Sequence, residues 1–260
     1  MKHLLVPIGS SENAKNTLQY AIDFAQVINA KVFVFRAYSV ITKAGTIINI
    51  SDIIQRETNL YMRTIVSSVE TKGVDIKLIT AKGGAVDSIK SIDKELNIDL
   101  IILGPKSNSV KEELFLGNTS GSIVKQTEIP TLVVPESYNF KVVSKVLLAF
   151  KSGIVKTDGV LSPLKSFASK ANLLLVKTPD HTGQDSILDS GLESIKSTLT
   201  IIENKTTFQG VTEHLHNNST DLLCVFRRNR GFFQKLWEKN SILKSEFYCE
   251  IPLLILNGKK

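Results

Sequence analysis

The chain has 260 residues, of which 42% are hydrophobic and 22% charged, with 15 glycines and 7 prolines. These proportions are typical of a folded protein with one large domain or two ordinary ones, and they exclude collagen-like and wholly disordered structure. No apolar run has the length of a membrane span, and the N-terminus turns polar too early for a signal peptide. We therefore expect a cytoplasmic protein that contacts no membrane.

The net charge of +7 lies mostly in the second half of the chain. Residues 1–138 carry 15 Lys and Arg against 14 Asp and Glu, whereas residues 139–260 carry 17 against 11. The basic cluster Arg227–Lys239 also contains Phe232, Phe233 and Trp237. Cations interleaved with aromatic rings can bind single-stranded nucleic acid. The favoured interpretation is that the rings pack the loop onto the domain while the cations stay solvated, so no nucleic-acid partner is expected.

The first half alternates strand and helix patterns. The short apolar run His3–Gly9 predicts a strand buried on both faces. Apolar residues spaced three and four apart predict a helix over Glu12–Ile28, capped by Ser10 or Ser11. The remaining patterns predict a strand at Lys31–Tyr38, a helix around Ile53–Val69, a strand at Val74–Thr80, and further strands within Asn97–Ser107 and Glu128–Pro135.

The second half repeats these patterns. The run Lys145–Lys151 matches the first strand at an offset of 142 residues, and Asn172–Pro179 matches the second strand. Near the end of each half the offset is 122, because Ser219–Asn229 matches Asn97–Ser107 and Glu250–Asn257 matches Glu128–Pro135. The second half therefore lacks about 20 residues, in the part that corresponds to Ser39–Thr71. Its third strand is expected at Thr206–Gln209.

Strands that alternate with helices predict a parallel, doubly wound sheet. The sequence thus predicts an α/β protein with two tandem doubly wound parallel-sheet domains, residues 1–138 and 139–260. The boundary falls near Glu136–Lys141.

Ligands of such sheets bind beyond the carboxyl ends of the strands, where the strand order reverses. The candidate segments are Pro7–Ser11 and Gly104–Ser120. Gly104 would let a ligand approach the backbone closely. The segment Gly117–Ser120 opens the last helix, and its free amides and hydroxyls could hold an anion. On these residues alone, a glycine turn and a helix cap without any ligand is the favoured interpretation, and an anion site is the alternative.

The opening LLVP, the strand DLIILG and the closing EIPTLVVP resemble the universal stress protein family, and the resemblance covers both halves. It implies a tandem protein of the Rossmann-like, adenine nucleotide alpha hydrolase-like fold, with ATP or AMP as ligand. Two glycines of the family's nucleotide motif are present, Gly104 and Gly117. Ser107 and Asn118 replace a glycine and a Ser/Thr, and Gly9 replaces an aspartate. The resemblance therefore implies weak binding in the first domain, by Pro7, Ile8, Gly9, Gly104, Ser107, Gly117, Asn118, Thr119 and Ser120.

The second domain lacks the glycines of this motif. Phe226 and Lys239 stand at the positions of the two glycines, and Lys151 stands where the family's aspartate would be. We therefore expect a degenerate domain without nucleotide. A scaffold or interaction module of the same fold, binding no nucleotide in either half, is the alternative function.

Catalytic and metal-binding patterns are absent from the sequence. It has no Cys-x-x-Cys, His-Glu-x-x-His or nucleophile elbow, and the pair His214 and His216 lacks further ligands. Neither an enzyme nor a metal protein is expected, and ATP hydrolysis near Glu112 and Glu113 is the least supported alternative. The 2 cysteines, Cys224 and Cys249, are expected to be buried thiols.

The resemblance also implies a mode of association. The last strands of the halves, Thr131–Val134 and Leu253–Leu256, are expected to pair antiparallel as an internal pseudo-dimer. A homodimer of the whole chain is a further alternative.

Overall fold

The computed structural model describes residues 1–9, 13–40, 50–104, 118–150, 159–179, 188–227 and 250–257, without the side chain of Asn118. The chain divides into two compact units. The first contains Met1–Asn108, Leu116–Thr127 and Glu136–Phe140, and the second contains Ser109–Phe115, Glu128–Pro135 and Lys141–Lys260. The domain boundary at residue 138 stays a prediction.

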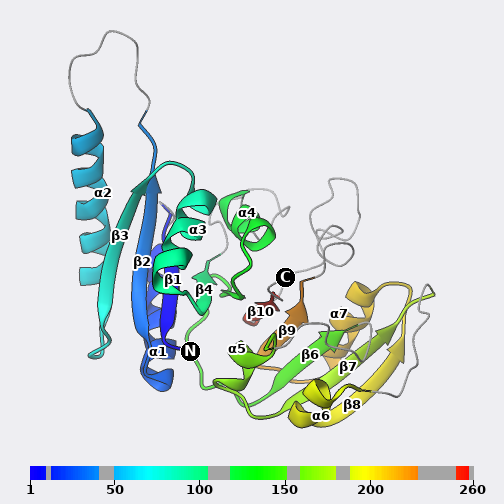
Figure 1. Cartoon of the computed structure of the whole chain (residues 1–260). Helices are drawn as coiled ribbons and strands as arrows, with labels where there is room; N and C mark the ends of the chain where they lie inside the picture. Colours follow the sequence, from blue (N-terminus) through cyan, green and yellow to red (C-terminus); the bar gives the residue numbers. More distant parts are fainter. Residues whose placement is uncertain are drawn as a thin grey trace. The chain divides into compact units, whose positions relative to one another are not determined.

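The first unit contains four parallel strands in the order β3-β2-β1-β4 (Figure 1). They are β1 (His3–Pro7), β2 (Lys31–Tyr38), β3 (Ile76–Lys82) and β4 (Leu100–Leu103). The helices are α1 (Ala14–Ile28), α2 (Ile50–Ser67), α3 (Ala85–Leu96) and α4 (Asn118–Gln126). Helix α1 packs against α2, and α3 packs against α4, as expected when one pair of helices covers each face of a doubly wound sheet.

The second unit contains six strands in the order β5-β10-β9-β6-β7-β8. They are β5 (Thr131–Val133), β6 (Val146–Phe150), β7 (Ala171–Lys177), β8 (Lys196–Glu203), β9 (Leu222–Phe226) and β10 (Leu253–Leu256). Its helices are α5 (Ser162–Lys165), α6 (Ser190–Ile195) and α7 (Thr207–Asn217). All neighbouring strands are parallel except β5 and β10, which are antiparallel with Leu132 opposite Leu254. The predicted fold class, α/β with tandem doubly wound sheets, is confirmed.

The central strands form the core of each unit. Leu4, Leu5 and Val6 of β1 are fully buried, and so are Leu222, Leu223 and Cys224 of β9. Burial on both faces explains why these strands are continuous apolar runs rather than alternating ones. The prediction that Cys224 is buried is confirmed, and Cys249 lies outside the described residues.

The second half is shorter than the first between its second and third strands, as the change in offset predicted. Residues 39–75 connect β2 to β3 and contain the 18-residue helix α2, whereas residues 178–195 connect β7 to β8 and contain the 6-residue helix α6.

Two local predictions are wrong. The third strand of the second half is β8 rather than Thr206–Gln209, because Thr206 caps helix α7 by accepting a hydrogen bond from the amide of Gln209 at 3.1 Å. Helix α1 begins at Ala14, so its N-cap residue is Asn13 rather than Ser10 or Ser11.

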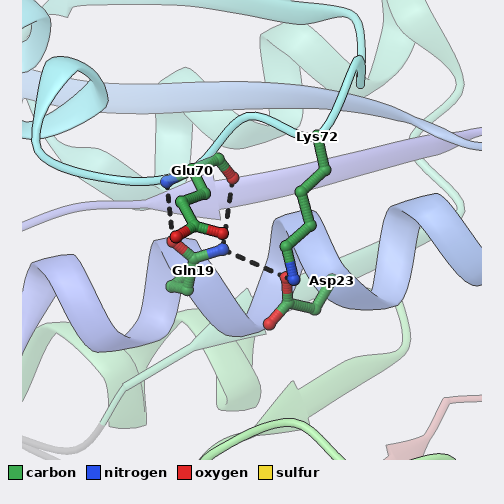
Figure 2. Close-up of polar contacts among 4 residues, drawn as sticks. All are labelled: Gln19, Asp23, Glu70 and Lys72. Atoms are coloured by element: carbon green, nitrogen blue, oxygen red, sulfur yellow. Dashed lines mark hydrogen bonds and ion pairs between the residues drawn. The ribbon is translucent and has the colours of Figure 1, made fainter.

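A polar clip fastens α1 to the segment before β3 (Figure 2). The side-chain amide of Gln19 both accepts from the backbone amide of Glu70 at 2.9 Å and donates to its carbonyl at 3.2 Å. Asp23 accepts from Gln19 at 3.0 Å and pairs with the ammonium of Lys72 at 2.8 Å. The side chain of Gln19 therefore pairs with the backbone of Glu70 through two hydrogen bonds, as a neighbouring strand would.

Among the residues that the structure describes, no helix combines the length and the apolar character that crossing a membrane requires.

Candidate functional site

The strand order of the first unit reverses between β1 and β4. The chain runs from β1 outward to β2 and β3, then crosses to β4 on the other side of β1. Ligands of open α/β sheets bind beyond the carboxyl ends of the two strands at such a reversal. Ile8 and Gly9 follow β1, and Gly104 follows β4, so these predicted residues share one edge of the sheet.

The start of α4 lies at the same edge. The hydroxyl of Ser120 donates to the carbonyl of Gly104 at 3.3 Å, and α4 has no acidic residue in its first turn. Thr119 is exposed beside it. The exposed amides at a helix start carry partial positive charge and favour an anion. Ser107 and Gly117 lie outside the described residues, and Asn118 begins α4.

Close packing against helix α1 requires a glycine at position 104. A Cβ built at this position would collide with the Oγ1 of Thr17 and would lie 2.7 Å from the Nδ2 of Asn13. Helix α1 thus fills the space that any larger residue would need. The glycine at this position is therefore explained without a ligand.

The carboxamide of Asn13 is an unexpected member of this edge. Asn13 is only 4% exposed, and within the described part of the chain neither its Oδ1 nor its Nδ2 has a hydrogen-bond partner. Sequence reasoning missed it. The available signal was the spacing of Asn13 and Thr17, two polar residues four apart on the otherwise apolar face of α1.

A second unexpected group surrounds Gly9. The guanidinium of Arg36 and the hydroxyl of Tyr61 each donate to the carbonyl of Gly9 at 2.8 Å. The guanidinium also stacks on the Tyr61 ring, 4.2 Å from its centroid. The position expected to hold an acidic side chain therefore has a cation beside it.

Ile8 and Pro7 pair with strand β2 at this edge of the sheet. The amide of Ile8 donates to the carbonyl of Phe35 at 2.9 Å and its side chain is buried. Pro7 is the last residue of β1 and pairs with Phe35 of β2. The pairing of both residues with β2 thus fixes the end of β1 directly before Gly9.

The corresponding edge of the second unit has bulkier residues. Phe226 ends β9 at the position of Gly104, and the amide of the next residue, Arg227, donates to Leu256 at 2.8 Å. Burial lowers the pKa of Arg227, and the charge of Glu128 opposes that shift. Lys151, Lys239, Glu112, Glu113 and the rest of the cluster Arg227–Lys239 lie outside the described residues.

Histidines and carboxylates do not gather into a metal centre within the described ranges. On α7, His216 is exposed and His214 is half-buried, and burial lowers the pKa of His214.

The strand order, the crossovers and the polar edge at β1 and β4 define a tandem member of the doubly wound α/β class. The chain belongs to the universal stress protein family, whose model matches residues 1–135. Universal stress proteins of Methanocaldococcus jannaschii and Synechocystis are 22% and 27% identical to it over 138 and 147 residues. These matches cover 51% and 50% of this chain and 81% and 96% of the two relatives.

The likeness in structure extends to the whole chain. The crystal structure of a universal stress protein from Archaeoglobus fulgidus superposes with a TM-score of 0.73 at 17% identity, covering 99% of this chain and 98% of that one. The second half, which lies beyond the residues that the family model matches, therefore shares the fold as well.

Proposed function

We propose that the protein acts in the stress response by binding an adenine nucleotide, AMP or ATP, weakly in its first unit. The observation that carries the proposal is the contact between Ser120 and Gly104, which holds the start of α4 at the strand reversal. The phosphates would be bound there by the helix amides and by the hydroxyls of Thr119 and Ser120. Binding is weak because Gly9 provides no carboxylate for the sugar or base, and because Ser107 stands where a glycine is expected.

Calorimetry with AMP and ATP tests this function. We expect heat from wild type, none from Gly117→Val, and nearly unchanged binding by Lys239→Ala, the substitution at the matching position of the second half. Release of adenine nucleotide on denaturing the purified protein would support the proposal further. Loss of binding in Lys239→Ala alone would place the nucleotide in the second half and contradict the proposal.

A scaffold without nucleotide is the second candidate. The collision that a Cβ at Gly104 would meet with Thr17 favours it, because that glycine is then required by packing alone. Absence of heat from wild type at millimolar AMP and ATP would establish this candidate instead.

We propose no catalytic step for either candidate. The test is release of inorganic phosphate during incubation with ATP, which should not exceed that of a heat-denatured sample.

An internal pseudo-dimer through the last strands remains part of the proposal. The antiparallel pairing of β5 with β10 supports it. Because Leu132 lies opposite Leu254 in that register, the double variant Leu132→Cys, Leu254→Cys should form an intrachain disulfide, with Leu132→Cys, Leu4→Cys as the unlinked control. Light scattering would separate a monomer from a homodimer of the tandem chain.

A further inference from the structure

Asn13 stands at the N-cap of α1 without capping it. Its backbone is in the right-handed helical region, at φ −71° and ψ −7°, and its side chain makes no hydrogen bond to the first turn. Asparagine is favoured at N-caps because its side chain usually satisfies an exposed amide there. Asn13 is only 4% exposed, and no capping hydrogen bond compensates for the burial of its carboxamide.

The hydroxyls nearest to Asn13 in the described part of the chain donate to other acceptors. The Thr17 hydroxyl donates to the backbone carbonyl of Asn13 at 3.0 Å, and the Ser120 hydroxyl donates to Gly104. Neither proton is then available to the Oδ1 of Asn13. Buried polar atoms are almost always hydrogen-bonded, so a carboxamide left without partners in the described part of the chain calls for a group that completes it.

The carboxamide lies where a ligand of this fold would be. Its Nδ2 lies against Gly104 at the end of β4, and Asn13 itself begins α1 beyond the end of β1. These are the two strands between which the order reverses.

The chemistry of a carboxamide narrows the group that it can bind. Its nitrogen donates and its oxygen accepts, side by side. A phosphate offers acceptors only and would leave Oδ1 without a partner. An adenine edge offers an adjacent donor and acceptor, and so does a pair of sugar hydroxyls; asparagine pairs with adenine in this way in protein–DNA complexes.

We propose that Asn13 is a specificity-determining residue that binds the nucleoside part of the ligand, through an adjacent donor and acceptor. This inference rests on the proposed binding of AMP or ATP in the first unit. The phosphates of the same ligand would be bound by the start of α4.

The test compares Asn13→Leu with the matched control Asn16→Leu, on the same helix. Leucine has the same number and branching of side-chain heavy atoms as asparagine and removes two buried polar atoms, so the midpoint of thermal unfolding should rise by about 3 °C or more. Calorimetry should show at least about a tenfold loss of affinity for AMP. Asn16 donates to the carbonyl of Tyr138 at 3.5 Å, so Asn16→Leu should retain AMP binding without gaining stability.

Ligand variants identify the part of the nucleoside that is bound. If the adenine edge is bound, inosine monophosphate should bind wild type at least about tenfold more weakly than AMP, and if the sugar is bound, 2′-deoxy-AMP should do so. Asn13→Leu should not distinguish these ligands. Asn13→Ala, which cannot overfill the site, should lose AMP binding like Asn13→Leu.

Several results would overturn the inference. Equal AMP binding by wild type and Asn13→Leu would do so while leaving the proposed function intact. Unchanged AMP binding by Asn13→Ala would do so too, whatever its unfolding midpoint, because the carboxamide would then have no part in binding the ligand. Wild type that binds neither AMP nor ATP overturns both this inference and the proposed nucleotide function.

Discussion

The hydroxyl of Ser144 donates to the Oδ2 of Asp221 at 2.7 Å. The same oxygen accepts the backbone amides of Ser144 at 3.0 Å and Lys145 at 2.8 Å, just before β6 begins. The first half repeats this arrangement at the start of β1, since the Oδ2 of Asp99 accepts the amide of Lys2 at 2.6 Å and that of His3, the first residue of β1, at 2.9 Å. In both halves a carboxylate that precedes the fourth strand thus fixes the entry to the first.

Removing the Asp221 carboxylate should destabilise the protein. Asp221→Ala leaves two backbone amides to water, and we expect a loss of about 1 kcal/mol in the free energy of unfolding, measured by urea titration. Asp221→Asn keeps an acceptor and should lose less. An equal loss in both variants would show that the negative charge, rather than the acceptor, fixes the strand entry.

The effect of Asp221 should depend on pH. Burial alone would raise its pKa above the ordinary 3.8, but the hydrogen bonds from Ser144 and Lys145 and the Lys145 charge hold it lower. A folded-state pKa below the unfolded one adds stability that is present above the unfolded value and lost as the pH falls through the folded one. The difference between wild type and Asp221→Ala should therefore be constant above about pH 5 and shrink below about pH 4.

Substitution of Gly104 should reveal the packing of α1. We expect Gly104→Ala to cost about 1–3 kcal/mol, because its Cβ would collide with Thr17. In a Thr17→Ala background the same change should cost clearly less. Denaturant titrations of the four proteins measure this coupling, and additive losses would exclude the collision as the cause.

The contacts of Gly9 connect β2 and α2 to the end of β1. Tyr61→Phe keeps the ring on which Arg36 stacks and removes the hydroxyl that donates to Gly9, so a loss of about 0.5–1.5 kcal/mol is expected. Arg36→Ala removes a hydrogen bond and the stacking, and should cost more. Arg36→Lys is the control for charge, since it lacks the planar group that stacks. Equal stabilities of wild type and Arg36→Ala would contradict the role of this contact.

The polar clip should depend on Gln19 rather than on its ion pair. Gln19→Ala removes both hydrogen bonds to Glu70, and about 1 kcal/mol of stability should be lost, with faster hydrogen exchange at the Glu70 amide. Lys72→Gln removes an exposed ion pair and should change stability less than Gln19→Ala does. A larger loss from Lys72→Gln than from Gln19→Ala would reverse this ranking.

Patterns of burial explain which elements the sequence could predict. Strand Lys31–Tyr38 was predicted with its observed bounds, because buried apolar residues make it a distinct run. Strand β8 was missed because its residues are mostly exposed or half-buried and leave no apolar run. Thr206 and Thr207 are β-branched residues of the kind that strands favour, yet the hydroxyl oxygen of Thr206 also suits the helix cap that it forms.

The site could be predicted only as far as the repeat determined the strand order. That order placed Gly9 and Gly104 at one edge, as the structure shows. Arg36 and Tyr61 were not predictable in this way, because their meeting at Gly9 depends on how β2 and α2 pack. Among the residues that the structure describes, the Asn13 carboxamide has no hydrogen-bond partner, and this too depends on tertiary packing that the sequence does not reveal.

The pairing of β5 with β10 has a consequence for synthesis on the ribosome. Val133 lies opposite Leu253, so the two strands emerge 120 residues apart. At about 5–20 residues per second, β5 spends roughly 6–24 seconds without this partner. During that interval its apolar edge can pair with another nascent chain, which makes β5 the segment where a chaperone would most reduce aggregation.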